Sequence, residues 1–131
     1  MKKIAVILIL LISVISVKAT VVSIKKESDG VTFNLDKGVM KAKICLDNMV
    51  EVKYTTLPLF LDKESLVVNN KWNFSHDFTV AEAPREVTLT TKSLKVIVNK
   101  KTNAVKFTDL SGNVILNEAE KSECGHDYRL P

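Results

Sequence analysis

A strict alternation of side chains between Gly38 and Leu46 (GVMKAKICL) constrains the fold of this chain more than any other feature. Every second side chain from Met40 onward is apolar and would point to one side of an extended backbone: Met40, Ala42, Ile44 and Leu46. The side chains between them would point to the other side: Lys41, Lys43 and Cys45. Because successive side chains of a strand face opposite sides of a sheet, this pattern predicts a strand with one buried face.

The same period of two recurs along the chain between groups of turn residues. Asp47-Asn48 predicts a hairpin turn into Met49–Thr55, where alternate side chains would face the core: Val50, Val52 and Tyr54. Further strands are expected at Val22–Glu27, Val31–Asp36, Phe78–Glu82, Glu86–Thr91, Leu94–Val98, Val105–Phe107 and Val114–Leu116. Turns are expected at Ser28-Asp29-Gly30, Ala83-Pro84-Arg85 and Ser111-Gly112-Asn113. About nine or ten short strands without helical periodicity predict an all-β fold, an antiparallel β-sandwich or barrel.

The first nineteen residues differ from the rest of the chain. Lys2 and Lys3 precede an apolar run from Ile4 to Val17, and small residues flank a cleavage point after Ala19. This arrangement predicts a signal peptide and export to the periplasm or the medium. A membrane anchor is the alternative, although the run is shorter than the roughly 20 residues of a spanning helix. We therefore expect a signal peptide at residues 1–19, a β-sandwich domain at 20–120, a tail at 121–131 and no stable membrane span.

Charge argues against a nucleic-acid partner. The chain has a formal net charge of +4, and three of these positive charges belong to Lys2, Lys3 and Lys18 of the signal peptide, which contains no acid. Residues 20–131 are therefore close to neutral. A surface that binds nucleic acid through its phosphates requires clustered positive charge, which this part of the chain does not show.

Two cysteines and two histidines are the candidates for thiol or metal chemistry. Cys124 and His126 lie close together in the tail, and His76 is the other histidine. Their spacing matches no zinc signature, and nothing in the sequence would orient His126 as a base for Cys124. We therefore predict no metal or cofactor site. A disulfide between Cys45 and Cys124 is left open, because export permits it but the sequence does not show that the two approach.

Acidic and aromatic residues are the candidates for hydrolysing or binding sugars. The carboxylates are scattered over turns and outward strand positions, so no catalytic pair is predicted: Asp36, Asp47, Glu51, Asp62, Glu64, Asp77, Glu82, Glu86 and Asp109. Trp72, the single tryptophan, could pack in the core or contact a sugar, and packing is the commoner role. The irregular stretch Leu57–Asn70 is long enough to cross between two sheets and to carry function.

Three segments together resemble the N-terminal, galactose-mutarotase-like β-sandwich domain of glycoside hydrolase family 31, the α-glucosidases and α-xylosidases. They are Gly38–Tyr54, Phe78–Val98 and Asn99–Asn117 (NKKTNAVKFTDLSGNVILN). Glu51 stands where that family often has arginine, and Asn103 stands at a turn position usually taken by glycine, a replacement that the turn geometry allows. The resemblance covers roughly residues 21–120.

The resemblance implies a function without implying a catalytic residue. In this family the catalytic aspartates belong to a (β/α)8 barrel that follows the sandwich, and neither of their motifs occurs in this chain. The resemblance therefore implies a non-catalytic domain or fragment that supports a barrel, in cis or from an adjacent reading frame, and meets carbohydrate through that parent enzyme. The alternative is a stand-alone carbohydrate-binding module with Trp72 as a contact. A sandwich built to pack against a barrel would also expose apolar surface and self-associate.

Overall fold

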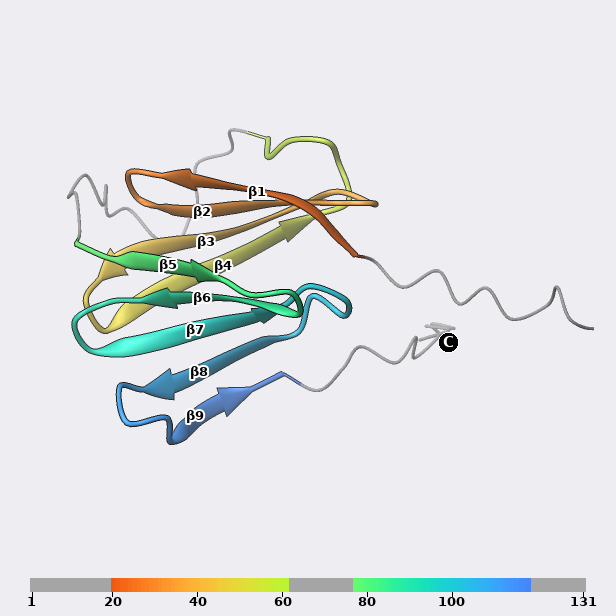
Figure 1. Cartoon of the computed structure of the whole chain (residues 1–131). Coiled ribbons are helices and arrows are strands. Elements are labelled where there is room, and N and C mark those ends of the chain that lie inside the picture. The colour runs from red at the N-terminus through yellow and green to blue at the C-terminus, as the bar shows by residue number, and fades with distance from the viewer. Residues whose placement is uncertain (1–19, 62–76, 119–131) are drawn as a thin grey trace, which may run out of the picture.

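The computed structural model describes residues 20–61 and 77–118, which form two antiparallel sheets and contain no helix (Figure 1). The four-stranded sheet consists of β1 (Val21–Glu27), β2 (Gly30–Leu35), β3 (Val39–Leu46) and β4 (Met49–Thr55). The five-stranded sheet consists of β5 (Thr79–Glu82), β6 (Glu86–Thr90), β7 (Leu94–Asn99), β8 (Val105–Asp109) and β9 (Val114–Asn117). The all-β prediction is confirmed. The predicted signal peptide and the tail lie outside the described residues.

Within each sheet, each strand pairs with the next strand along the chain, so each sheet is a simple meander with no crossover inside it. The expected turn residues join the strands. Asp29-Gly30 lies at the turn between β1 and β2, and Asp47-Asn48 joins β3 to β4. In the last turn, the Asp109 carboxylate accepts a hydrogen bond from the Asn113 backbone amide at 2.8 Å. Local turn chemistry is thus sufficient to bring neighbouring strands together, and the contact between the two sheets completes the fold.

The two sheets share one hydrophobic core. Alternate residues of β2 and β3 contribute from one sheet, and alternate residues of β6, β7 and β8 contribute from the other. The core cluster consists of Val31, Phe33, Leu35, Met40, Ala42, Val87, Leu89, Leu94, Val96, Val98 and Val105. A fully buried aliphatic or aromatic side chain typically contributes about 1.5–3 kcal/mol to folding, so this shared layer is the main source of stability. The architecture is therefore the predicted β-sandwich.

Hydrogen bonds at both ends of the strands also connect the sheets. The backbone amide of Val21 donates to the carbonyl of Lys100 at 2.9 Å, which ties the start of β1 to the turn after β7. At the opposite end, the Thr91 hydroxyl donates to the carbonyl of Asp47 at 2.5 Å, which ties the turn after β6 to the turn after β3. These bonds fix how one sheet lies over the other.

A β-bulge in β3 corrects the predicted alternation at its end. Ile44 pairs with Val50 and Leu46 pairs with Met49, so Cys45 is an extra residue with no partner across the ladder. An extra residue reverses which side chains face inward. As a result Cys45 is 2% exposed, whereas Leu46, predicted inward, is 36% exposed. Burial raises the pKa of the Cys45 thiol. Cys124 lies outside the described residues.

Tyr54 is a second correction. It pairs with the buried Met40, as the alternation requires, yet 45% of Tyr54 is exposed. The reason is that β4 is an edge strand, with a neighbouring strand on one side only. The phenol hydroxyl donates to the carbonyl of Lys37 at 3.2 Å, at the turn between β2 and β3. The alternation correctly placed Tyr54 on the same face of the sheet as Met40. It could not show that the strand carrying Tyr54 lies at the edge of the sheet.

Positive backbone φ angles occur at two predicted turn residues, Asn103 and Gly112, and also at Gly38, which was predicted to begin a strand. Asn103 has φ = 57°, the left-handed region that asparagine tolerates, so its assignment to a glycine-like turn position is confirmed. Gly38 and Gly112 share φ = 94° but differ in their surroundings. A Cβ atom on Gly38 would lie 1.9 Å from the carbonyl oxygen of Thr55, whereas nothing lies within 4 Å of the corresponding position on Gly112.

The different surroundings of Gly38 and Gly112 predict different losses of stability when each glycine is replaced by alanine. Gly112→Ala should lower the free energy of unfolding by roughly 1–2 kcal/mol, the cost of left-handed backbone in a residue with a Cβ. Gly38→Ala should cost at least about 2 kcal/mol more, because its Cβ would also overlap backbone atoms. Urea unfolding followed by circular dichroism measures both. Equal midpoints for the two variants would contradict the steric role of Gly38.

Candidate functional site

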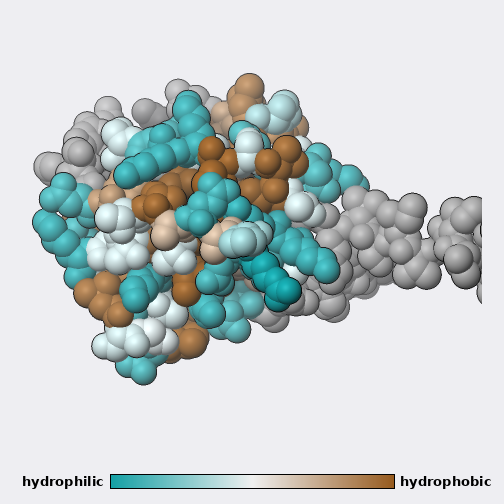
Figure 2. Space-filling view, viewed as in Figure 1, coloured by the Kyte–Doolittle hydropathy of each residue, from teal (hydrophilic) through white to brown (hydrophobic). Residues whose placement is uncertain are grey.

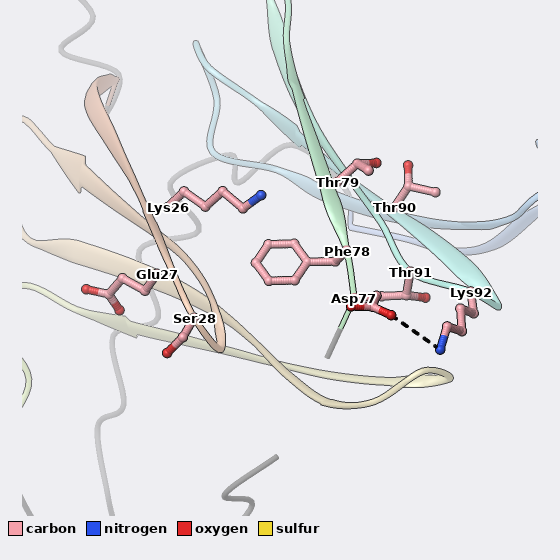
Figure 3. Close-up of a pocket in the computed structure, with 9 residues that line it drawn as sticks. All are labelled: Lys26, Glu27, Ser28, Asp77, Phe78, Thr79, Thr90, Thr91 and Lys92. Carbon is pink, nitrogen blue, oxygen red and sulfur yellow. Dashed lines mark ion pairs between the residues drawn. The ribbon is translucent and has the colours of Figure 1, made fainter. Parts of the chain in front are cut away.

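Two surface hollows are the candidate sites among the described residues. The first, of about 480 Å³, lies between the turn that follows β1 and the neighbouring ends of β5 and β6 (Figure 3). Its lining consists of Lys26, Glu27, Ser28, Asp77, Phe78, Thr79, Thr90, Thr91 and Lys92. Because β1 and β5 are the edge strands of their sheets, this hollow lies along one open side of the sandwich.

A cation–π contact crosses the first hollow. The ammonium nitrogen of Lys26 lies 4.8 Å from the centre of the Phe78 ring, and Figure 3 shows the lysine reaching from β1 toward that ring. The same phenyl ring packs against the hydrophobic core. Such a contact contributes about 0.5–1 kcal/mol at an exposed site. Its effect is to hold the two edge strands together across the opening.

Three other polar side chains of this hollow, those of Asp77, Glu27 and Thr91, already have partners. The Asp77 carboxylate lies 3.7 Å from the ammonium of Lys92. Glu27 pairs with Lys41 at 2.9 Å. The Thr91 hydroxyl accepts a hydrogen bond from the Leu94 backbone amide at 3.1 Å, in addition to its bond with the facing sheet. The first hollow therefore looks like a junction between strands rather than a ligand site.

Two carboxylates, Glu27 and Asp29, are bridged by one lysine in an ion-pair network and do not form a catalytic pair. The Lys41 ammonium lies 2.9 Å from Glu27 and 3.1 Å from Asp29, and so fills the space between the two acids. A hydrogen bond from Lys41, reinforced by its charge, outweighs partial burial and lowers the pKa of Glu27 below its ordinary value of 4.5. A general acid in a glycosidase needs a raised pKa, so this network cannot supply one.

The network shifts the lysine as well. Partial burial acts to lower the pKa of Lys41, but hydrogen bonds to Glu27 and Asp29 outweigh it and leave that pKa above its ordinary value of 10.5. Both shifts favour the charged forms. The three side chains therefore stabilise the first hairpin, because they join β1, its turn and β3.

The second hollow, of about 600 Å³, lies at the end of β4 beside the turn between β2 and β3. Its lining consists of Asn34, Leu35, Asp36, Lys37, Gly38, Val39, Tyr54, Thr56 and Pro58. It combines an exposed aromatic ring with amide, carboxylate and ammonium groups. This combination is typical of sites that bind small polar molecules with an apolar face.

The residues that the sequence singled out lie mostly beyond the described ranges. Trp72, His76, Cys124 and His126 are outside them, so the predicted roles of these residues stay predictions. Within residues 20–61 and 77–118, no group of three or more His, Cys, Asp or Glu side chains is placed to hold a metal ion. Over the same residues, no helix is long and apolar enough to cross a membrane.

Sequence reasoning missed Tyr54 as a surface residue. Its place in the alternation assigned it to the core, and only its position on an edge strand exposes it. One signal was present in the sequence: Pro58 and the irregular stretch that follows it. They end the regular alternation shortly after Tyr54 and indicate that the next strand along the chain does not cover β4.

Comparison with solved structures finds proteins that contain a similar fold. Residues covering 79% of this chain superpose on a glycoside hydrolase family 31 dextranase from Flavobacterium johnsoniae, with a TM-score of 0.69 and 19% identity. That enzyme has been solved in complexes with isomaltotriose and with glucose. An uncharacterized protein from Listeria monocytogenes EGD-e, solved with glucose, magnesium and calcium, matches 77% of this chain with a TM-score of 0.60 and 18% identity.

These matches concern only a part of each solved protein. This chain spans 13% of the dextranase and 9% of the Listeria protein. No family model matches the sequence, and no curated protein does. The predicted resemblance to a family 31 sandwich is confirmed in the fold, and at this level of identity the match carries the fold alone.

The Glu27–Lys41 network predicts a dependence of stability on pH. Because the pKa of Glu27 is lowered by folding, its contribution is fully present above about 4.5 and is lost as the pH falls through the folded pKa. Lys41→Gln should therefore lower the free energy of unfolding by about 1 kcal/mol at pH 7, and the deficit should shrink below pH 4.5. Urea midpoints between pH 7 and pH 3 measure this.

The matched control is Lys53→Gln. Lys53 pairs with Glu51 at 3.3 Å, but their side chains are 60% and 40% exposed, so solvent screens the pair. This control should lose little at any pH. A Lys41→Gln deficit that stays constant down to pH 3 would show that packing of the lysine stem, and not its charge, stabilises the hairpin.

Proposed function

We propose that this chain acts as the non-catalytic β-sandwich domain of an exported family 31 α-glycosidase, of the α-glucosidase or α-xylosidase type. In this role it supports a catalytic barrel and contributes to the rim of the sugar pocket. The observation that carries the proposal is the superposition of 79% of the chain on a part of the Flavobacterium dextranase. The sequence resemblance, made from ordered strands and turns, points to the same domain.

The distribution of acids supports a non-catalytic role. Glu27 and Asp29 are both bound to Lys41. Asp36 and Asp109 cap turns by accepting hydrogen bonds from the backbone amides of Lys37 and Asn113 at 2.8 Å each. Hydrogen bonds lower the pKa values of Glu27 and Asp109, so these two carboxylates are unsuited to protonating a glycosidic oxygen.

The edge of the five-stranded sheet supports a role beside a partner. All four residues of β9 are exposed, and three consecutive apolar residues reach solvent: Val114 at 60%, Ile115 at 64% and Leu116 at 57%. Figure 2 shows apolar side chains at the surface among hydrophilic ones. An edge strand with exposed apolar residues and free backbone groups is a template for pairing. A barrel of the same enzyme would be its natural cover.

The direct test of the proposal is genetic. Sequencing the DNA downstream of this reading frame should reveal a frame that encodes a family 31 barrel, and co-expression of the two products should yield a complex that hydrolyses an α-glucoside. The purified chain alone should show no turnover of the same substrate. Downstream DNA without such a barrel, or turnover by the homogeneous chain alone, would overturn the proposal.

A second prediction concerns the isolated chain in solution. We expect it to self-associate through β9, with the apparent mass rising with concentration in sedimentation experiments. Ile115→Lys should shift the chain toward the monomer, because a charge on an edge strand opposes pairing. Val22→Lys is the matched control, since Val22 is 69% exposed on β1, the edge strand of the other sheet. A monomeric wild-type chain would contradict the prediction.

A further inference from the structure

We propose that the second hollow, beside Tyr54, binds the pyranose ring of a saccharide. The proposal goes beyond a supporting role for the sandwich and does not depend on the presence of a barrel. It commits to a sugar because the hollow pairs an exposed aromatic ring with side chains that can both donate and accept hydrogen bonds. A pyranose has the same two properties, an apolar face of C–H groups and a rim of hydroxyls.

The Tyr54 ring is held in place for stacking. Its hydroxyl donates to the Lys37 carbonyl at 3.2 Å, and its backbone is paired with Met40 in the ladder. Tyr54 is 45% exposed and lines the hollow. A ring that is oriented before the ligand arrives loses little conformational freedom on binding, which favours affinity.

Polar groups surround this ring at positions fixed by the turn between β2 and β3. One carboxylate oxygen of Asp36, Oδ1, accepts backbone hydrogen bonds from Thr20 at 3.0 Å and from Lys37 at 2.8 Å. These two bonds orient the carboxylate and leave Oδ2 with no hydrogen bond from the described residues. The Asn34 amide nitrogen donates to Ser23 at 2.9 Å, so its carbonyl oxygen is available as an acceptor.

Lys37 adds a donor. Its ammonium forms no ion pair with any described residue, whereas Lys41 in the hairpin network contacts two carboxylates. A cation, a carboxylate and an amide in one hollow can bond the alternating donor and acceptor sites of a sugar's hydroxyls. The volume of about 600 Å³ falls within the range of about 300–1,000 Å³ typical of small-molecule sites.

The first hollow lacks these properties, so the proposed sugar site is assigned to the second hollow alone. Figure 3 shows Lys26 directed at the Phe78 ring, so a sugar would have to displace that ammonium in order to stack. Asp77 and Lys92 in the same hollow neutralise each other at 3.7 Å. Of the two hollows, the one at Tyr54 therefore offers the more accessible ring and the freer hydrogen-bonding groups.

The experiment is a titration of the full chain, purified after export, with isomaltotriose and in parallel with glucose. Two-dimensional ¹H–¹⁵N spectra report both affinity and location. We expect chemical-shift changes in the amides of Lys37, Gly38 and Thr56, with a dissociation constant of about 1 mM, as suits an open and shallow site. Absence of shifts at saturating sugar concentrations, or shifts confined to Phe78 and its neighbours, would overturn the proposal.

Three variants distinguish the contribution of the Tyr54 ring to binding from that of the groups around it. Tyr54→Leu keeps an apolar side chain and should weaken binding by about fivefold to tenfold through loss of stacking. Tyr54→Phe keeps the ring, loses the hydrogen bond to the Lys37 carbonyl and should bind within about threefold of wild type. Ile115→Ala, on the exposed edge of the other sheet, should bind as wild type does. Equal affinity of Tyr54→Leu and wild type would overturn the role of the ring.

The proposal can still be tested if Tyr54→Leu does not fold. If Tyr54→Leu has no cooperative urea transition, Lys37→Ala replaces it, because that substitution removes the ammonium and preserves the backbone carbonyl that holds Tyr54. Lys37→Ala should weaken binding by about twofold to fivefold. Unchanged affinity in Lys37→Ala would show that the ammonium does not contact the sugar and would contradict the proposal.

Discussion

The contact between the inner faces of the two sheets is the interaction on which the rest of this structure depends. Neither sheet can bury its apolar face against its own residues. Each sheet is therefore stable only when it covers the apolar face of the other. Phe33 on one sheet and Leu89 on the other lose all exposure in the shared core. Hydrogen bonds from Val21 and Thr91 to the opposite sheet then fix the relative placement of the layers.

Because the core occupies the centre of both sheets, everything that could meet a ligand or a partner lies at their margins. One open side, at β1 and β5, is closed by Lys26 and Phe78. The turn between β2 and β3 presents a hollow with Tyr54. The edge at β9 exposes three consecutive apolar residues, Val114, Ile115 and Leu116. A sandwich of this kind can therefore combine a structural role in a larger enzyme with a separate contact to saccharide, since different margins serve the two.

The order of strands and turns was predictable because it depends on neighbours in the sequence. Alternation located the strands of both sheets, and Asn103 was correctly placed at a left-handed turn position. The predictions that were wrong concern Leu46 and Tyr54. A single extra residue at Cys45 reverses the inward face at the end of β3. The exposure of Tyr54 depends on the position of β4 at the edge of its sheet as formed by residues 20–61 and 77–118, which alternation cannot reveal.

The sequence by itself determined the all-β class, the hairpins and the identity of most core residues, because a period of two and the choice of turn residues act over a few positions of the chain. Only the tertiary structure decided which side chains near the sheet margins are covered. It joined Glu27, Asp29 and Lys41 into a network and left Tyr54 at the surface beside Asp36 and Lys37. The physical reason is that burial at an edge depends on the neighbouring strand and the facing layer, which come from residues distant in sequence.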